Sequence, residues 1–122
     1  MLLGDMQDWK PNIASIIEYA GDIYPDTEVV SRLVSGEVHR TNYKEVCLRS
    51  RKLASKLVQD GYKQGDVLAT LALNTFRHLE AYYGISGMGA VNHTLNFRLH
   101  PEQAVYIITV SYTHLRAHET DT

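Results

Sequence analysis

The sequence predicts an α/β fold in which a short hairpin precedes alternating helices and parallel strands, and two observations indicate it. A continuous apolar run of strand length, VLATLAL at 67–73, suits a strand that is covered on both faces of a parallel sheet. From residue 67 on, strand-like and helix-like segments alternate, which is typical of right-handed βαβ crossovers. No stretch approaches about eighteen uninterrupted apolar residues, so we expect no membrane-spanning segment.

The first half of the chain predicts a helix, a hairpin and a longer helix. Apolar residues recur at helical spacing from 13 to 23, and Pro25 ends this helix. Two β-rich runs at about 28–34 and 37–41 flank a turn pair at 35–36, which predicts a hairpin. Thr41 can cap a helix over about 42–60, and Gly61 follows in a position suited to a left-handed cap. The basic residues of this helix lie mostly off its apolar stripe and are interpreted as a solvated face: Arg49, Arg51, Lys52 and Lys56.

The second half of the chain supplies the alternating elements. After the apolar strand, Asn74-Thr75 opens a helix whose sequence is FRHLEAYYGISGMGA, and a short strand follows at about 90–94. The segment NFRLH is then a loop, and Pro101 is well placed in the first turn of a last helix. The apolar pattern of that helix stops at Ile108, where the composition changes.

Composition and charge exclude several classes of protein. With 12 basic and 14 acidic side chains the formal net charge is −2, which disfavours an electrostatic nucleic-acid binder. The one cysteine, Cys47, rules out an internal disulfide and fits a reducing compartment. Asp5 and Asp8 stand where a signal peptide requires a basic start and an apolar run. We therefore expect a cytoplasmic protein of one modest domain.

The end of the chain carries a candidate metal motif that has a simpler explanation. His114 and His118 are four residues apart, a spacing at which a helix could present two imidazoles to one zinc ion. However, Val110 to Thr120 matches at every position the translated end of an adapter used in transposon-based sequencing libraries. We therefore interpret residues 109–122 as a non-native, adapter-derived tail and residues 1–108 as a truncated natural sequence.

Glycines and the cysteine are candidate functional residues with structural explanations. Gly84, Gly87 and Gly89 follow a helix instead of opening one, and their order differs from the dinucleotide-binding pattern G-x-G-x-x-G. Backbone turns and close helix–strand packing explain them better. Cys47 lies on the apolar stripe of its helix, so we expect a small buried hydrophobe and no nucleophile.

The histidines are weighed in the same way. His78 and Glu80 are two residues apart and diverge on a helix, so they cannot share a ligand face. We interpret His78 as a surface or hairpin-facing residue. His93 ends a predicted strand, where ligands of α/β sheets bind, although a hydrogen-bonded structural histidine is the favoured interpretation.

Several segments together resemble a known family. MQDW, HRTNYKEV and the run from GDVLATLAL to EQAVYI are similar to the N-terminus of adenylate-forming acyl-CoA synthetases, of the medium- and long-chain fatty-acid–CoA ligase type. The resemblance spans residues 4–108 and is most specific over 74–103. It implies that the chain forms part of the N-terminal portion of the large α/β domain of these enzymes.

The resemblance implies an activity for a longer parent protein. Such ligases use ATP, Mg²⁺ and coenzyme A to convert a fatty acid into acyl-CoA through an acyl-adenylate, and a homodimer is one possible assembly. No Ser/Thr/Gly-rich phosphate loop ending in lysine occurs in residues 1–108, so we expect the fragment to be inactive and assign no catalytic or metal-binding residue. The alternative is a small non-enzymatic α/β module for interaction or dimerisation.

Arg98 is the one candidate binding residue. In the resembled ligases this stretch usually reads Asn-Pro-Arg-Leu, and the arginine lies where the phosphates of coenzyme A approach. Guanidinium suits phosphate because it offers paired donors and keeps its charge. Here Phe97 replaces the proline, which removes a constraint on the loop. The phosphates of coenzyme A are the candidate ligand of Arg98, and a salt bridge or an exposed charge is the competing interpretation.

Overall fold

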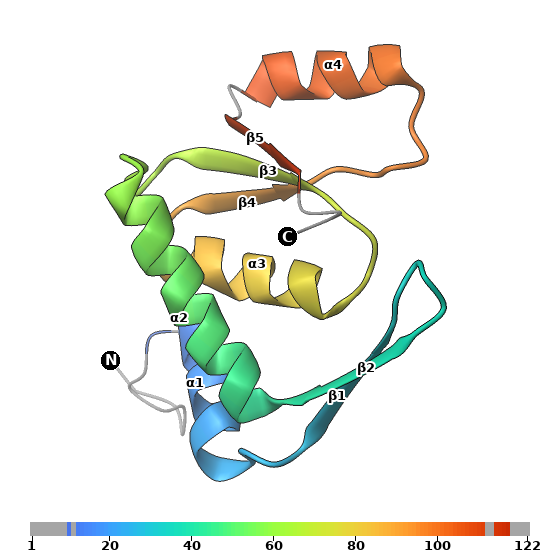
Figure 1. The fold of residues 1–122 in the computed structure, drawn as a ribbon. Coiled ribbons are helices and arrows are strands. Elements are labelled where there is room, and N and C mark those ends of the chain that lie inside the picture. Colours follow the sequence, from blue (N-terminus) through green and yellow to red (C-terminus); the bar gives the residue numbers. More distant parts are fainter. Residues whose placement is uncertain (1–9, 11, 112–113, 118–122) are drawn as a thin grey trace, which may run out of the picture.

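The computed structural model describes residues 10, 12–111 and 114–117, which form four helices and five strands (Figure 1). In chain order the elements are α1 (Ile13–Ile23), β1 (Glu28–Arg32), β2 (Val38–Asn42), α2 (Tyr43–Gln59), β3 (Val67–Leu71), α3 (Phe76–Gly87), β4 (Val91–Thr94), α4 (Pro101–Ser111) and β5 (His114–Ala117). The predicted α/β class and the order of its elements up to α4 are confirmed.

The hairpin and the main sheet are separate. β1 pairs with β2 in antiparallel register from Glu28 opposite Asn42 to Arg32 opposite Val38. The second sheet has the order β4-β3-β5, and both of its ladders are parallel. The chain therefore crosses from β3 to β4 through α3, and then back across β3 to β5 through α4. Because right-handed crossovers in opposite directions place their helices on opposite faces, α3 and α4 lie on either side of this sheet (Figure 1).

The cap of α2 differs from the prediction by one residue. Asn42, and not Thr41, is the N-cap, and its Oδ1 accepts a hydrogen bond of 2.9 Å from the backbone N–H of Glu45. Thr41 remains in the hairpin ladder opposite Val29, so its backbone is committed to the strand. The expected cap at Thr41 was therefore wrong because the hairpin extends one residue further than its composition indicated.

Two helices end in the same glycine motif. Gly61 follows α2 with a φ of 97°, as predicted, and the N–H of Tyr62 donates to the carbonyl of Leu57 at 3.1 Å. Gly89 follows α3 with a φ of 88°, and the N–H of Ala90 donates to the carbonyl of Ile85 at 3.2 Å. Each left-handed glycine ends its helix and turns the chain away from the helix axis before the next strand.

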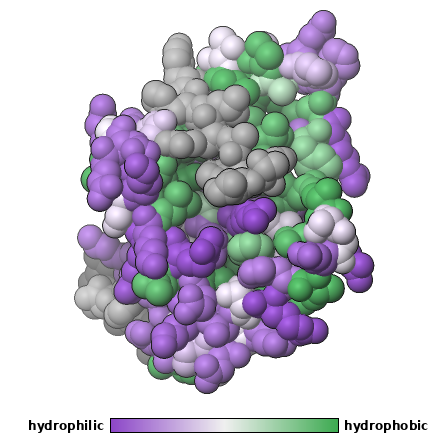
Figure 2. Space-filling model, viewed as in Figure 1, coloured by the Kyte–Doolittle hydropathy of each residue, from purple (hydrophilic) through white to green (hydrophobic). Residues whose placement is uncertain are grey.

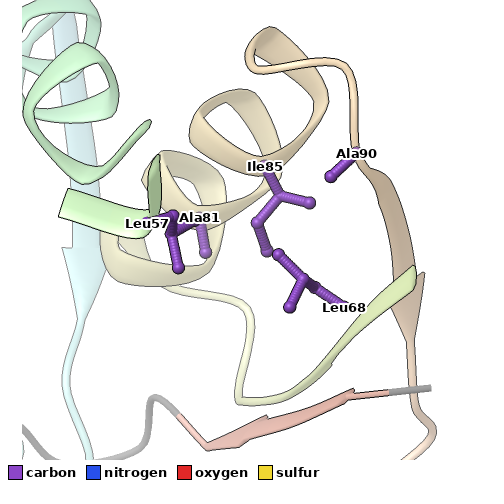
Figure 3. Close-up of a cluster of buried hydrophobic side chains, with 5 residues drawn as sticks. All are labelled: Leu57, Leu68, Ala81, Ile85 and Ala90. Carbon is purple, nitrogen blue, oxygen red and sulfur yellow. The ribbon is translucent and has the colours of Figure 1, made fainter. Parts of the chain in front are cut away.

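The main core lies where α2 and α3 cover one face of the sheet. Leu68 points from β3 toward Ile85 of α3, with Leu57 and two alanines around them (Figure 3). Leu68 and Ile85 are among the largest fully buried side chains of the described residues. A second cluster joins α1 to α2 through Ile17, Val46 and Cys47. Cys47 is a free thiol and is buried, as expected for a small hydrophobe.

Among the described helices, α4 is the least covered. None of its residues is buried, and Val105 and Tyr106 are 63% and 69% exposed. Figure 2 shows further hydrophobic residues that reach the surface among polar ones on the face seen in Figure 1. Among the helices that the structure describes, none is long and apolar enough to cross a lipid bilayer.

The structure extends beyond Ile108, where the sequence pattern stops. α4 continues to Ser111, and β5 adds a strand that the sequence analysis did not include. Strand pairing uses backbone N–H and C=O groups, which every residue except proline supplies, so it tolerates sequences of any origin. The boundary at residue 108 and the adapter origin of residues 109–122 therefore stay predictions.

Candidate functional site

The polar residues of interest gather at the carboxyl ends of β3 and β4 and in the loop that follows. Leu95, directly after β4, is buried, and its N–H donates to the carbonyl of Thr70 at 2.8 Å. Beyond it the loop turns on Asn96, whose Oδ1 accepts from the N–H of Arg98 at 2.9 Å. The loop thus begins from an anchored residue and then projects from the sheet edge where α/β proteins bind ligands.

Arg98 is an exposed cation on this loop. Its Cζ lies 5.5 Å from the centroid of the Phe97 ring, and Phe97 is 52% exposed. Among the ion pairs of the described residues, Arg98 takes part in none. In the part of the chain that the structure describes, Arg98 is therefore an exposed charge without an ion pair, and the contact to coenzyme A stays a prediction.

His100 and Pro101 define the start of α4 on the other side of the loop. The carbonyl of His100 accepts from the N–H groups of Gln103 and Ala104 at 2.9 and 3.1 Å, and its own N–H donates to the Gln103 side chain at 3.3 Å. This reciprocal arrangement resembles a capping box and confirms that the helix begins at Pro101. The loop that carries Arg98 is therefore limited to the few residues between two defined ends.

His93 bridges β4 and α4. Its Nδ1 lies 3.1 Å from Oγ of Ser111, and that hydroxyl also lies 2.8 Å from the carbonyl oxygen of Ile107. A hydrogen bond between the imidazole and the hydroxyl therefore ties β4 to the last turn of α4. The geometry matches the favoured interpretation of a hydrogen-bonded structural histidine.

His78 faces the sheet instead of the surface or the hairpin, so that part of the sequence interpretation was wrong. Its Nε2 lies 3.1 Å from Oγ1 of Thr70, which is fully buried and also lies 3.3 Å from Oδ1 of Asn92. Burial lowers the pKa of His78, which favours the neutral ring at neutral pH. Nδ2 of Asn92 is buried and has no partner among the residues described. Thr70 was missed because its position in an apolar run concealed its hydroxyl.

Glu80 is a buried carboxylate that the sequence analysis did not predict. It is 6% exposed and accepts a hydrogen bond of 2.7 Å from Nε of Arg49 on α2. Burial raises the pKa of Glu80, and the Arg49 guanidinium opposes that rise. A usable signal was present, because Phe76, Glu80 and Gly84 follow one another at intervals of four on one face of the helix.

The same helix face explains Gly84. A Cβ at Gly84 would lie 3.0 Å from the backbone oxygen of Ser50 and 3.0 Å from a methyl carbon of Leu53. This glycine therefore allows α3 to approach α2, so the close packing is between helices and not between helix and strand as expected. Gly89 serves a turn, as expected.

The hairpin is attached to α3 through residues that the sequence analysis did not single out. The ring of His39 stacks on Phe76 with centroids 3.8 Å apart and planes 11° apart. Oγ of Ser31 accepts a hydrogen bond of 2.9 Å from the first N–H of the helix, that of Phe76. These contacts orient the hairpin and lie away from the Arg98 loop, so we assign them a structural role.

The histidine pair at the end of the chain remains outside the site. His118 lies outside the described residues, and His114 is described only through the backbone of β5. Among the residues described, no group of three His, Cys, Asp or Glu side chains could hold a metal ion.

A parallel sheet with crossover helices on both faces and a loop that carries an exposed arginine at its carboxyl edge defines an α/β domain. More narrowly, the chain belongs to the family of AMP-binding enzymes, which it matches over residues 17–115.

Curated relatives place the match within this family. The chain is 50% identical over 103 residues to a long-chain-fatty-acid–CoA ligase of Thermus thermophilus, which covers 84% of this chain and 19% of that protein. It is 49% identical over 107 residues to a medium-chain-fatty-acid–CoA ligase of Ectopseudomonas oleovorans, covering 88% and 20%. The chain therefore spans about a fifth of the length of these relatives.

Solved structures share the fold. A fatty acyl CoA synthetase of Mycobacterium tuberculosis superimposes with a TM-score of 0.77 at 22% identity, over 87% of this chain and 21% of that chain. The anthranilate CoA ligase AuaEII, in complex with anthranoyl-AMP, gives a TM-score of 0.79 at 18% identity, over 93% and 21%. At these identities the likeness concerns the fold alone.

Proposed function

We propose that this chain is the N-terminal part of a fatty-acid–CoA ligase. The single observation that carries the proposal is the 50% and 49% identity to two ligases of that type. In the proposed reaction a carboxylate oxygen attacks the α-phosphorus of ATP and pyrophosphate leaves. The thiolate of coenzyme A then attacks the acyl carbon and AMP leaves. The non-enzymatic interaction module is less well supported, because those two relatives are themselves ligases.

The residues of this chain fit only one part of that chemistry. Mg²⁺ would shield the triphosphate of ATP in that reaction. Residues 1–108, however, offer no Ser/Thr/Gly-rich loop with a lysine that could hold the triphosphate. We therefore assign no step of adenylate formation to this chain. Arg98 is suited to the phosphates of coenzyme A, because its guanidinium is exposed and presents paired donors.

Pyrophosphate release tests the proposal. The purified 122-residue chain, given ATP, Mg²⁺ and a fatty acid, should release none above background, whereas the complete parent protein should release it. The parent should also produce AMP and acyl-CoA when coenzyme A is added. A parent that releases no pyrophosphate with any fatty acid would contradict the ligase assignment, and release by the fragment would contradict its proposed inactivity.

Arg98→Ala in the parent should raise the KM for coenzyme A and leave adenylate formation unchanged. Loss of a charge-assisted contact of about 1.4 kcal/mol corresponds to about a tenfold higher KM. The measurement is the KM for coenzyme A in the complete reaction, beside the rate of fatty-acid-dependent pyrophosphate exchange. Arg98→Lys keeps the charge without the paired donors and should give an intermediate KM.

Equal effects of Arg98→Ala on both half-reactions would contradict the coenzyme A contact. Phe97→Pro is a useful companion variant, because it restores the residue usual in the resembled ligases. The proline ring would fix φ at position 97, directly before Arg98. It should not raise the KM for coenzyme A if the loop geometry suits the contact.

The origin of residues 109–122 is tested separately. We propose that this segment is adapter-derived, and amplification of the locus from source DNA without that adapter should give a different sequence after Ile108. Recovery of the same residues followed by a natural stop codon would contradict it. We also propose that the parent ligase is cytoplasmic. The single cysteine of this chain, which is buried and free, supports a reducing compartment. A homodimer stays a prediction.

A further inference from the structure

The loop between β4 and α4 contains a tight turn, and Asn96 is its first residue. The backbone N–H of Leu99 donates to the carbonyl of Asn96 at 3.2 Å, which is the bond that closes a β-turn over residues 96–99. Phe97 and Arg98 are therefore the two central residues of this turn. Asparagine is favoured at the first position, because its side chain can accept a hydrogen bond from the backbone two residues further on.

The side chain of Asn96 makes this second bond. Its Oδ1 accepts from the N–H of Arg98 at 2.9 Å, so one residue holds the turn through both its main chain and its side chain. Asn96 is exposed and belongs to neither of the two core clusters. Removal of its side chain should therefore act on the backbone of Arg98 and leave the core intact.

The turn begins from a fixed point on the sheet. Directly before Asn96, Leu95 is buried, and its N–H donates to the carbonyl of Thr70 in β3 at 2.8 Å. The chain would leave the sheet at this point with or without the Asn96 side chain. What the bond from Arg98 to Asn96 adds is the orientation of the backbone from which the guanidinium extends.

The side chain of Arg98 is restrained as well. Its Cζ lies 5.5 Å from the centroid of the Phe97 ring, a distance at which a cation and an aromatic ring attract each other. An arginine that is restrained in its backbone and its side chain loses less conformational freedom when it binds an anion. The turn therefore raises the affinity of Arg98 for an anionic ligand without adding a contact.

We propose that Asn96 is a positioning residue for coenzyme A, which acts through Arg98. The inference rests on the proposed function, because it takes the phosphates of coenzyme A as the anion that Arg98 contacts. Asn96 itself does not touch the ligand. Its effect should appear in the KM for coenzyme A and not in adenylate formation, in which coenzyme A takes no part.

Kinetics of the complete parent protein test the proposal. Asn96→Ala should raise the KM for coenzyme A about threefold, in line with the loss of one exposed hydrogen bond, and leave fatty-acid-dependent pyrophosphate exchange unchanged. Asn96→Ser should give a smaller rise, because its hydroxyl can accept the same N–H more weakly. An unchanged KM in Asn96→Ala, or an equal loss in both half-reactions, would overturn the proposal.

Asn12→Ala is the matched control for these variants. Asn12 is exposed, and its Oδ1 also accepts a backbone N–H at 2.9 Å, that of Ser15 in the first turn of α1. The substitution removes the same kind of bond from another part of the chain and should not change the KM for coenzyme A. A rise equal to that of Asn96→Ala would show a general loss of stability and overturn the positioning role.

A double-mutant cycle separates this inference from the function on which it rests. If Asn96 acts through Arg98, then adding Asn96→Ala to Arg98→Ala should raise the KM for coenzyme A no further. A further threefold rise would overturn the positioning role. An effect of Arg98→Ala without one of Asn96→Ala would contradict that role alone. No effect of Arg98→Ala would instead contradict the coenzyme A contact, and the positioning role with it.

Discussion

Replacing Leu68 by alanine should lower the free energy of unfolding by about 2 to 5 kcal/mol, the usual cost of a truncated core leucine. Leu68 is fully buried at the centre of β3 and points into the cluster formed by α2 and α3 (Figure 3). The substitution removes apolar contacts and leaves a cavity between rigid elements that cannot collapse fully. A domain of this size has little stability in reserve, so a large unfolded fraction is expected at 25 °C.

Leu73→Ala provides the matched control for this measurement. Leu73 lies just after the same strand but is 37% exposed, so the same truncation should cost much less. Urea unfolding followed by circular dichroism measures both variants. Equal midpoints for Leu68→Ala and Leu73→Ala would show that the sheet does not form the core of the folded chain.

Replacing Arg49 by methionine should cost about 2 to 3 kcal/mol at neutral pH, because it leaves the Glu80 carboxylate buried and unpaired. The expected loss is smaller than for a fully buried pair, since the Arg49 side chain is 55% exposed while that of Glu80 is 7% exposed. Arg51→Met is the matched control, because its ion pair with Glu18 is exposed on both sides. It should change stability by less than about 1 kcal/mol.

The loss in Arg49→Met should shrink as the pH falls. Burial already raises the pKa of Glu80 above its ordinary value of 4.5, and removing the guanidinium raises it further. The folded state then binds a proton more tightly than the unfolded state, so stability increases as the pH falls through the raised pKa toward 4.5 and decreases as the pH rises. Unfolding curves at about pH 5 and pH 7.5 measure the difference.

Two outcomes would contradict this account of Glu80. One is a loss in Arg49→Met that does not change with pH, and the other is an equal loss in Arg51→Met. The double variant Arg49→Met, Glu80→Met should recover most of the stability, because it replaces the ion pair with apolar groups of similar size and leaves no buried charge.

Local signals were sufficient for most elements of the fold. The apolar run of β3, the helical spacing in α1 and α2, and the glycine after α2 each depend on neighbours within a few residues. The cap of α2 was misplaced by one residue because the hairpin ladder, a contact between separate segments, decides where the strand ends. β5 was not predicted because residues 109–122 were interpreted as an adapter-derived tail and left out of the fold, whereas its pairing with β3 uses backbone groups that any such segment supplies.

The candidate site also contains residues that the sequence indicated and contacts that only the structure shows. Arg98 and Phe97 were singled out through a resemblance to known ligases, and the structure adds that the cation is exposed and lies over the Phe97 ring. The hydrogen bonds of His78 to Thr70, and of Glu80 to Arg49, join residues that are eight and thirty-one positions apart. No local pattern encodes such pairs, because they depend on how the helices dock on the sheet.

The sequence by itself determined the class of fold, the family, and the helices and strands up to the start of α4. Periodicity and turn residues carry that information, since they act through the nearest turns of the backbone. Only the tertiary structure decided which polar groups became buried, which helix faces met at Gly84, and which segment covered the edge of β3. Those outcomes arise from packing between distant segments, where space and unpaired hydrogen-bonding groups select the partner.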